Sequence, residues 1–265
     1  MPTIEAVLDT QTGSASWITM AQRIAQEIHK SNEKDFDYIK LAMCSAMAYY
    51  RNHRFPFNEA DGWLFELIDG QQTYEKGATM EYVKTDGVYE VGEIVFAGPP
   101  EDMVMPITTY CKVGGTRWMD MGVTTMEDIR YLTPTTDATG YPEWYAWFDD
   151  AMHFHPIPEG GNVSTVRLDY VKDIGVPTYR WNGTGWSFFH PRGATLSDSW
   201  TSPWLEERYG GELIRARAKW DLYYNVYHDT ENAMMQAEHT GLALKHLRKT
   251  QMNLNHRLRR MPIKI

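Results

Sequence analysis

The hydrophobic period of the sequence changes twice along the chain, from helical to strand-like and back to helical. From Ser16 to about His29, and again after Asn32, apolar residues recur three and four positions apart, which predicts two amphipathic helices. Asn32 is suited to cap the second helix, and Pro56 is expected to stop it. The N-terminal fifth of the chain is therefore expected to be a helical hairpin.

The strand-like part covers residues 62–172, which are rich in Val, Tyr, Thr and Ile and are interrupted by Gly, Pro and Asp. The segments that fit strands are Val88–Phe96, Thr108–Val113 and Val163–Val171. The clearest hairpin is Glu143–His155, with Asp149 and Asp150 at its turn. An antiparallel β region is therefore expected in the middle of the chain.

Residues 175–202 show no sustained period, although they carry many aromatic side chains among Gly, Ser, Thr and Pro. A polar linker would not have this composition, and long ordered loops are commonly functional. We expect a long ordered aromatic loop that packs on its own fold or on a neighbouring molecule. The candidate interface residues are Trp181, Trp186, Phe188, Trp200 and Trp204.

The helical period returns from about Pro203, with one break at which Asp229 or Thr230 can cap the next helix. Two long helices are therefore expected to close the chain. No acidic residue follows Glu238, while basic residues accumulate. Residues 257–265 are expected to form a basic tail.

These patterns together predict an α+β protein. Its architecture would be a four-helix bundle built from N- and C-terminal helical hairpins, with an inserted antiparallel β lobe. The predicted parts are the bundle (1–58 and 203–256), the β-rich lobe (59–202) with its long aromatic loop (175–202), and the basic C-terminal tail (257–265).

The composition narrows the classes of function. A hydrophobic content of 43% contradicts disorder, and a net charge of -9 argues against a general nucleic-acid binder. The 10 Trp and 16 Tyr are unusually many and suit contact surfaces as well as cores. Cys44 and Cys111 are expected to be reduced, buried thiols. No secretory signal and no apolar run of about 20 residues is visible, so synthesis in a cytosol and no membrane insertion are expected.

Motifs for catalysis or metal binding are weak. His153 and His155 point to one face of a strand, but no further ligand is placed to complete a metal site. Asp149 and Asp150 lie at an exposed turn, where nothing would separate their pKa values. The glycines at 114–115 fit no phosphate-loop pattern and are better explained as a turn between strands. We therefore predict that the chain is not an enzyme and that it has no catalytic residues, metal or cofactor.

Two binding interpretations remain open. Trp181, Trp186 and Trp200 could form a platform on which a glycan stacks, although an interface or a loop core explains them better. The basic tail could bind nucleic acid, but its positive charges suit an acidic groove of a protein partner better.

Three segments carry a family resemblance: Gly62–Gly77, Tyr145–Ile174 and Glu212–Leu247. The segment Gly62–Gly77 is similar to an entry strand followed by a Gly-Gln turn and a Tyr. Tyr145–Ile174 is similar to a strand hairpin that ends in Pro-x-Pro before an apolar strand, and Glu212–Leu247 to a C-terminal helical pair. In this order they resemble the head-to-tail adaptor proteins of tailed bacteriophages. The aromatic stretch 175–203 is longer than expected for a compact adaptor.

The resemblance implies a structural virion protein at the head–tail junction, made in the host cytoplasm, without enzymatic activity. Its subunits would form a ring, usually matching the twelve-fold portal, through which DNA passes without sequence-specific binding. The partners would be the portal protein, further copies of the chain and a downstream tail, nozzle or neck protein. A C-terminal arm would dock on the portal. In this chain we expect that arm to use its basic and apolar side chains Arg257, Arg259, Arg260, Ile263, Lys264 and Ile265.

Overall fold

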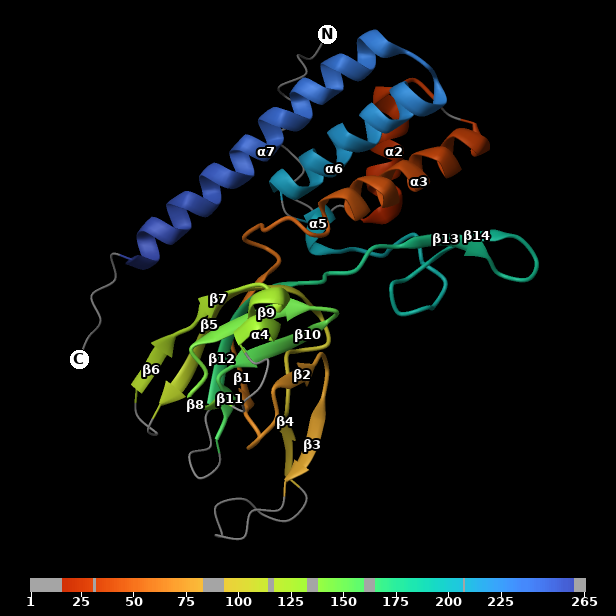
Figure 1. The fold of residues 1–265 in the computed structure, drawn as a ribbon. Coiled ribbons are helices and arrows are strands. Elements are labelled where there is room, and N and C mark those ends of the chain that lie inside the picture. The colour runs from red at the N-terminus through yellow and green to blue at the C-terminus, as the bar shows by residue number, and fades with distance from the viewer. Residues whose placement is uncertain are drawn as a thin grey trace. The chain divides into compact units, whose positions relative to one another are not determined.

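The computed structural model describes residues 16–30, 32–82, 93–113, 117–132, 138–159, 165–206 and 208–259. The chain divides into two compact units, one made of Met1–Asn58 and Ile174–Ile265, the other of Glu59–Asp173. We call them the helical unit and the strand unit and describe each by itself (Figure 1).

The N-terminal part of the helical unit forms helices α2 (Trp17–Glu27) and α3 (Glu33–Tyr50). Ser16 caps α2, because its hydroxyl accepts the N–H of Thr19. Asn32 caps α3 by accepting the N–H of Asp35 at 2.8 Å. Both predicted helices and the Asn32 cap are confirmed, although α3 ends at Tyr50 and does not continue to Pro56.

The C-terminal part contains α5 (Pro203–Glu206), α6 (Arg208–Asp221), the π-helix η1 (Leu222–Val226) and α7 (Thr230–Arg259). Asp229 caps α7 by accepting the N–H of Asn232 at 3.1 Å. It is one of the two residues predicted to cap this helix. Helix α6 packs against both α3 and α7. Figure 1 shows α7 lying along α6 and continuing past its end.

Helices alone do not build the core of the helical unit. Strands β13 (Thr178–Trp181) and β14 (Trp186–Phe189) form a hairpin between the two groups of helices along the chain. The ring of Phe188 in this hairpin meets the ring of Trp17 edge-on at 5.7 Å. Trp204, on the short helix α5, is 1% exposed in the same core. The hairpin is therefore part of the packing of this unit.

The strand unit contains two four-stranded sheets and two smaller strand pairs. The first sheet has the order β1 (Glu59–Glu66), β12 (Thr165–Lys172), β5 (Met103–Val113), β6 (Arg117–Asp120). The second has the order β2 (Thr73–Glu75), β10 (Ala151–His155), β9 (Trp144–Phe148), β7 (Gly122–Val123). The smaller pairs are β3 (Thr79–Tyr82) with β4 (Glu93–Phe96), and β8 (Thr139–Gly140) with β11 (Ile157–Pro158). Helix α4 (Met126–Leu132) packs on β9 and β10.

Both four-stranded sheets contribute to one hydrophobic core. Val166 and Leu168 of β12 lie in it, and so do Met152 and Phe154 of β10, because alternate residues of a strand point to the same face. The intervening residues of β10 therefore point away from this core. One of them, His153, is nevertheless almost fully buried.

The predicted hairpin Glu143–His155 is confirmed, since β9 and β10 pair in antiparallel register around Asp149 and Asp150. Both aspartates have positive φ angles, 52° and 55°, as the common two-residue hairpin turn requires. The expected strands at 108–113 and 163–171 fall largely within β5 and β12. Residues 88–92 of the third expected strand lie outside the described residues.

The predicted architecture, a four-helix bundle with an inserted antiparallel β lobe, is wrong, although the chain is α+β. Strands outnumber helices among the described residues, and helix α4 lies within the strand unit. Two strand pairings, β7 with β9 and β8 with β11, are parallel. The sequence pattern failed here because two-residue strands are too short to show a period, and their partners are set by tertiary packing.

Both cysteines are free and buried, as predicted. Burial raises the pKa of the Cys44 thiol to about 12. Among the helices of the described residues, none has the length and apolar character that crossing a membrane requires.

Replacement of Met47 by alanine tests the core of the helical unit. Met47 is fully buried, so Met47→Ala should lower the free energy of unfolding by about 2–5 kcal/mol. Met234→Ala is the matched control, because Met234 is 76% exposed and its loss should cost about 0.5 kcal/mol or less. Urea unfolding of both variants measures the difference, and equal effects would contradict the assigned core.

Stability should fall in alkali because buried phenols resist ionisation. Burial is the main cause that raises the pKa of Tyr74 and of Tyr227, and the Asp35 carboxylate raises that of Tyr227 further. Above the unfolded tyrosine pKa of about 10, unfolding releases protons, so the stabilisation present below that pH is lost as the pH rises toward the folded values. Urea midpoints should therefore drop above about pH 10. Tyr227→Phe should flatten the drop, and an unchanged slope would contradict this cause.

Candidate protein-contact surface

The hairpin β13–β14 carries four aromatic rings on one face. Its register pairs Tyr179 with Phe188 and Trp181 with Trp186. Residues directly opposite each other in an antiparallel pair share a face, and so do residues two apart in one strand. We call Tyr179, Trp181, Trp186 and Phe188 the aromatic strip.

Each ring of the aromatic strip contacts the next one along the hairpin. The centroid of Tyr179 lies 4.5 Å from that of Phe188 and 5.4 Å from that of Trp186, on which it stacks. Trp186 meets Trp181 edge-on at 6.2 Å. Phe188 is 8% exposed, whereas Trp181 and Trp186 are 57% and 61% exposed. The strip therefore runs from the hydrophobic core of the helical unit out into solvent.

The turn of the hairpin is held by its own polar groups. The side-chain oxygen Oδ1 of Asn182 accepts the backbone N–H groups of Thr184 at 2.9 Å and Gly185 at 2.8 Å, and its side-chain Nδ2 donates to the Ser187 hydroxyl at 2.9 Å. Gly183 has a φ of 100°, which glycine adopts without strain. A turn held in this way presents the two tryptophans in one arrangement, which lowers the entropy that a partner must overcome.

The hairpin and the residues that follow it carry positive charge. Residues 175–197 contain Arg180 and Arg192 and no aspartate or glutamate. The Arg180 guanidinium stacks on Phe189 at 4.2 Å and donates to the Gly193 carbonyl at 3.4 Å. Arg180 therefore lies on the face of the hairpin opposite the aromatic strip, and exposed tryptophan is itself enriched at protein–protein contact sites.

The structure separates the five predicted interface residues. Trp181 and Trp186 lie together at the exposed end of the strip, and Phe188 forms its buried end. Trp200 is half-buried, 5.8 Å from Trp17, and Trp204 lies inside the core. Of the five, Trp181, Trp186 and Phe188 share one surface.

Sequence reasoning missed Tyr179 and the hairpin itself. The dipeptide Asn182-Gly183 between two short aromatic stretches is a strong hairpin signal and could have revealed both strands.

A second exposed aromatic group lies on α3, α6 and η1 and was also missed. The Arg217 guanidinium lies 4.2 Å from the ring of Tyr49 and 4.0 Å from that of Trp220. Trp220 in turn stacks on Tyr224 at 5.3 Å, and Tyr49 and Tyr224 are more than half exposed. We call these four residues the Arg217 cluster. Arg217, Trp220 and Tyr224 are three and four residues apart, so their contacts could have been read from helical spacing. The contact with Tyr49 could not, because that residue lies on a helix distant in sequence.

Two of the predicted portal-docking residues belong to the last helix. Arg257 and Arg259 fall within α7, but their side chains lie outside the described ones, and residues 260–265 lie outside the described chain. Within the described residues, no group of three His, Cys, Asp or Glu side chains could hold a metal ion.

Comparison with known proteins yields no family model that matches the chain and no match among curated protein sequences.

Removing the exposed tryptophans should leave the helical unit folded. The double variant Trp181→Ala/Trp186→Ala should change the free energy of unfolding by about 1 kcal/mol or less, because mostly exposed side chains contribute little. Phe188→Ala should lower it by about 3–5 kcal/mol, because the buried ring leaves a cavity. Urea unfolding compares the two, and a larger loss in the tryptophan variant would mean that these rings serve the fold.

Proposed function

We propose that this protein is a structural subunit of a tailed-phage neck, an adaptor that forms a ring, joins the portal to the tail and lets DNA pass. The observation that carries the proposal is the aromatic strip, whose two outer tryptophans are more than half exposed and flank a turn held by hydrogen bonds. Large exposed aromatic side chains on a folded protein are expected where another protein covers them.

Ring assembly needs two different surfaces on each subunit, because a ring with head-to-tail contacts joins one patch to another. The helical unit offers two candidates, the aromatic strip and the Arg217 cluster. Tyr38 and Leu41 on α3 are also 47% and 43% exposed and add apolar area to this unit. These surfaces support lateral contact between copies.

The length of α7 supports a role for the C-terminus as a docking arm. Its 30 residues correspond to about 45 Å of helix, more than twice the length of α6. The segment after Glu238 is basic, so it suits an acidic groove on the portal. The proposed contacts are ion pairs of Arg257, Arg259 and Arg260 with portal carboxylates and burial of Ile263 or Ile265.

DNA is expected to pass such a ring without being held. The net charge of -9 favours repulsion of the phosphate backbone by the lumen wall. A ring with a basic inner wall would contradict this part of the proposal.

Mass photometry of the purified chain with and without its cognate portal tests the function. We expect a discrete complex that contains about one copy per portal subunit, since the arms would dock on equivalent portal sites. Deletion of residues 254–265 should abolish the complex. The double variant Trp181→Ala/Trp186→Ala should still dock on the portal through its C-terminal arm, but the contacts between neighbouring copies should weaken. We then expect complexes with fewer than one copy per portal subunit.

Tyr131→Ala is the control for loss of an exposed ring, because Tyr131 is 82% exposed and lies outside both aromatic surfaces. It should bind like the unmodified chain. No complex at micromolar concentration would refute the adaptor function, and saturable binding to host polysaccharide that the tryptophan variant loses would favour a glycan-binding module instead.

A further inference from the structure

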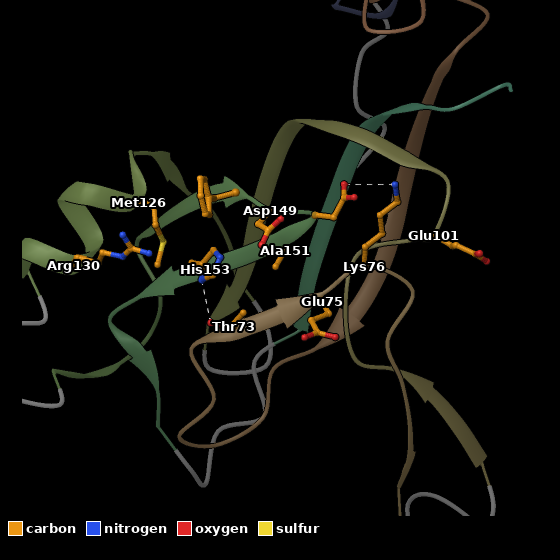
Figure 2. Close-up of a pocket in the computed structure, with 11 residues that line it drawn as sticks. Thr73, Glu75, Lys76, Glu101, Met126, Arg130, Asp149, Ala151 and His153 are labelled. Atoms are coloured by element: carbon orange, nitrogen blue, oxygen red, sulfur yellow. Dashed lines mark hydrogen bonds and ion pairs between the residues drawn. The ribbon is translucent and has the colours of Figure 1, made fainter. Parts of the chain in front are cut away.

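The strand unit contains an open pocket of about 670 Å³ on the face of β10 that is turned away from the hydrophobic core. Figure 2 shows its walls: Thr73 and Glu75 from β2 on one side, Met126 and Arg130 from α4 on the other, and His153 at the centre. A volume of this size is within the range of pockets that bind small ligands or side chains.

The charges of the pocket are mostly acidic. Lys76 and Asp150 pair with each other at 3.8 Å, so they neutralise one another. The other charged residues that line the pocket are three carboxylates, Glu75, Glu101 and Asp149, and one cation, Arg130. The excess of carboxylates favours a positively charged ligand.

His153 adds a buried imidazole at the centre of the pocket (Figure 2). Its ring is 9% exposed, and Nδ1 lies 3.0 Å from the Thr73 hydroxyl oxygen. In the described part of the chain, its Nε2 is buried and has no hydrogen-bond partner. Such atoms are rare in folded proteins because the lost hydrogen bond to water is not replaced. The contact with Thr73 fits either tautomer of a neutral ring, because Nδ1 can donate to the hydroxyl oxygen or accept from the hydroxyl group.

The histidine ring is expected to be neutral. Burial lowers the pKa of His153, and the Arg130 guanidinium lowers it further, against the opposing effects of the Phe148 backbone and Asp149. A neutral ring can accept a hydrogen bond, which a protonated ring cannot.

Apolar surface lies beside these acceptors. The ring of Phe148 is 52% exposed, and Met126 and Ala151 line the same pocket. Arginine fits this combination better than lysine, because its planar guanidinium pairs with carboxylates through several N–H groups and stacks on aromatic rings. Its aliphatic stem can pack on the apolar lining.

We propose that this pocket binds an arginine side chain presented by another protein. The guanidinium pairs with Asp149 and Glu75 and stacks on Phe148, beside the imidazole of His153. The pocket is larger than one side chain, which leaves room for the residues that flank the arginine. This inference goes beyond the proposed adaptor function and does not depend on it, since it rests on the strand unit alone.

The test follows the ring signals of His153 by ¹H–¹³C NMR of the full chain during titration with acetyl-arginine-amide. The uncharged analogue acetyl-citrulline-amide has nearly the same shape and is the matched ligand control. We expect saturable shifts with arginine and none with citrulline. His153→Asn assigns the signals.

Substitutions in the pocket test which residues recognise the arginine. Asp149→Asn with Glu75→Gln should weaken arginine binding about tenfold or more, since charge-assisted hydrogen bonds to both carboxylates are lost. Asp69→Asn, an exposed acidic residue outside the pocket lining, should leave the affinity unchanged.

Four results would overturn the assignment. They are the absence of any shift, equal shifts with citrulline, preferential shifts with an anionic acetyl-aspartate-amide, and tighter binding of spermidine, which would indicate a free polyamine site. Because portal is absent from this titration, failure here leaves the adaptor proposal standing, and failure of portal binding leaves this site standing.

Discussion

The burial of aromatic rings from distant parts of the chain is the interaction on which the helical unit depends. Trp17 begins α2, Phe188 lies in β14 and Trp204 lies in α5, yet all three are buried in one core. Trp17 also meets Phe188 edge-on, which anchors the hairpin β13–β14. Without that anchor, a two-stranded hairpin would be only marginally stable in water.

The same anchor explains why an exposed apolar surface can persist. The aromatic strip continues without interruption from the buried ring of Phe188 to Trp181, so the outer tryptophans are positioned by packing as well as by the turn. The pocket on the strand unit differs in kind. Carboxylates outnumber cations in its lining, a buried histidine lies beside them, and the ligand proposed for it is a cation. The two surfaces therefore suit chemically different partners.

Local signals predicted a large part of the secondary structure. The period of apolar residues located α2, α3 and the C-terminal helices, and short polar side chains marked the caps at Asn32 and Asp229. The turn at Asp149 and Asp150 located the hairpin β9–β10. The architecture was predicted wrongly, because short parallel pairings and the packing of β13–β14 into a helical core depend on contacts between distant residues.

The sequence by itself determined where α2, α3 and α7 begin and where one hairpin turns, since each depends on residues close together in the chain. Only the tertiary structure decided which aromatic residues face solvent. Trp181 and Trp186 are exposed, whereas Trp204, which was predicted to belong to the same interface, is buried. It also decided that Nε2 of His153 lacks a partner within the described part of the chain. Burial and hydrogen bonding of a side chain are set by neighbours that are distant in sequence, and a local pattern does not contain them.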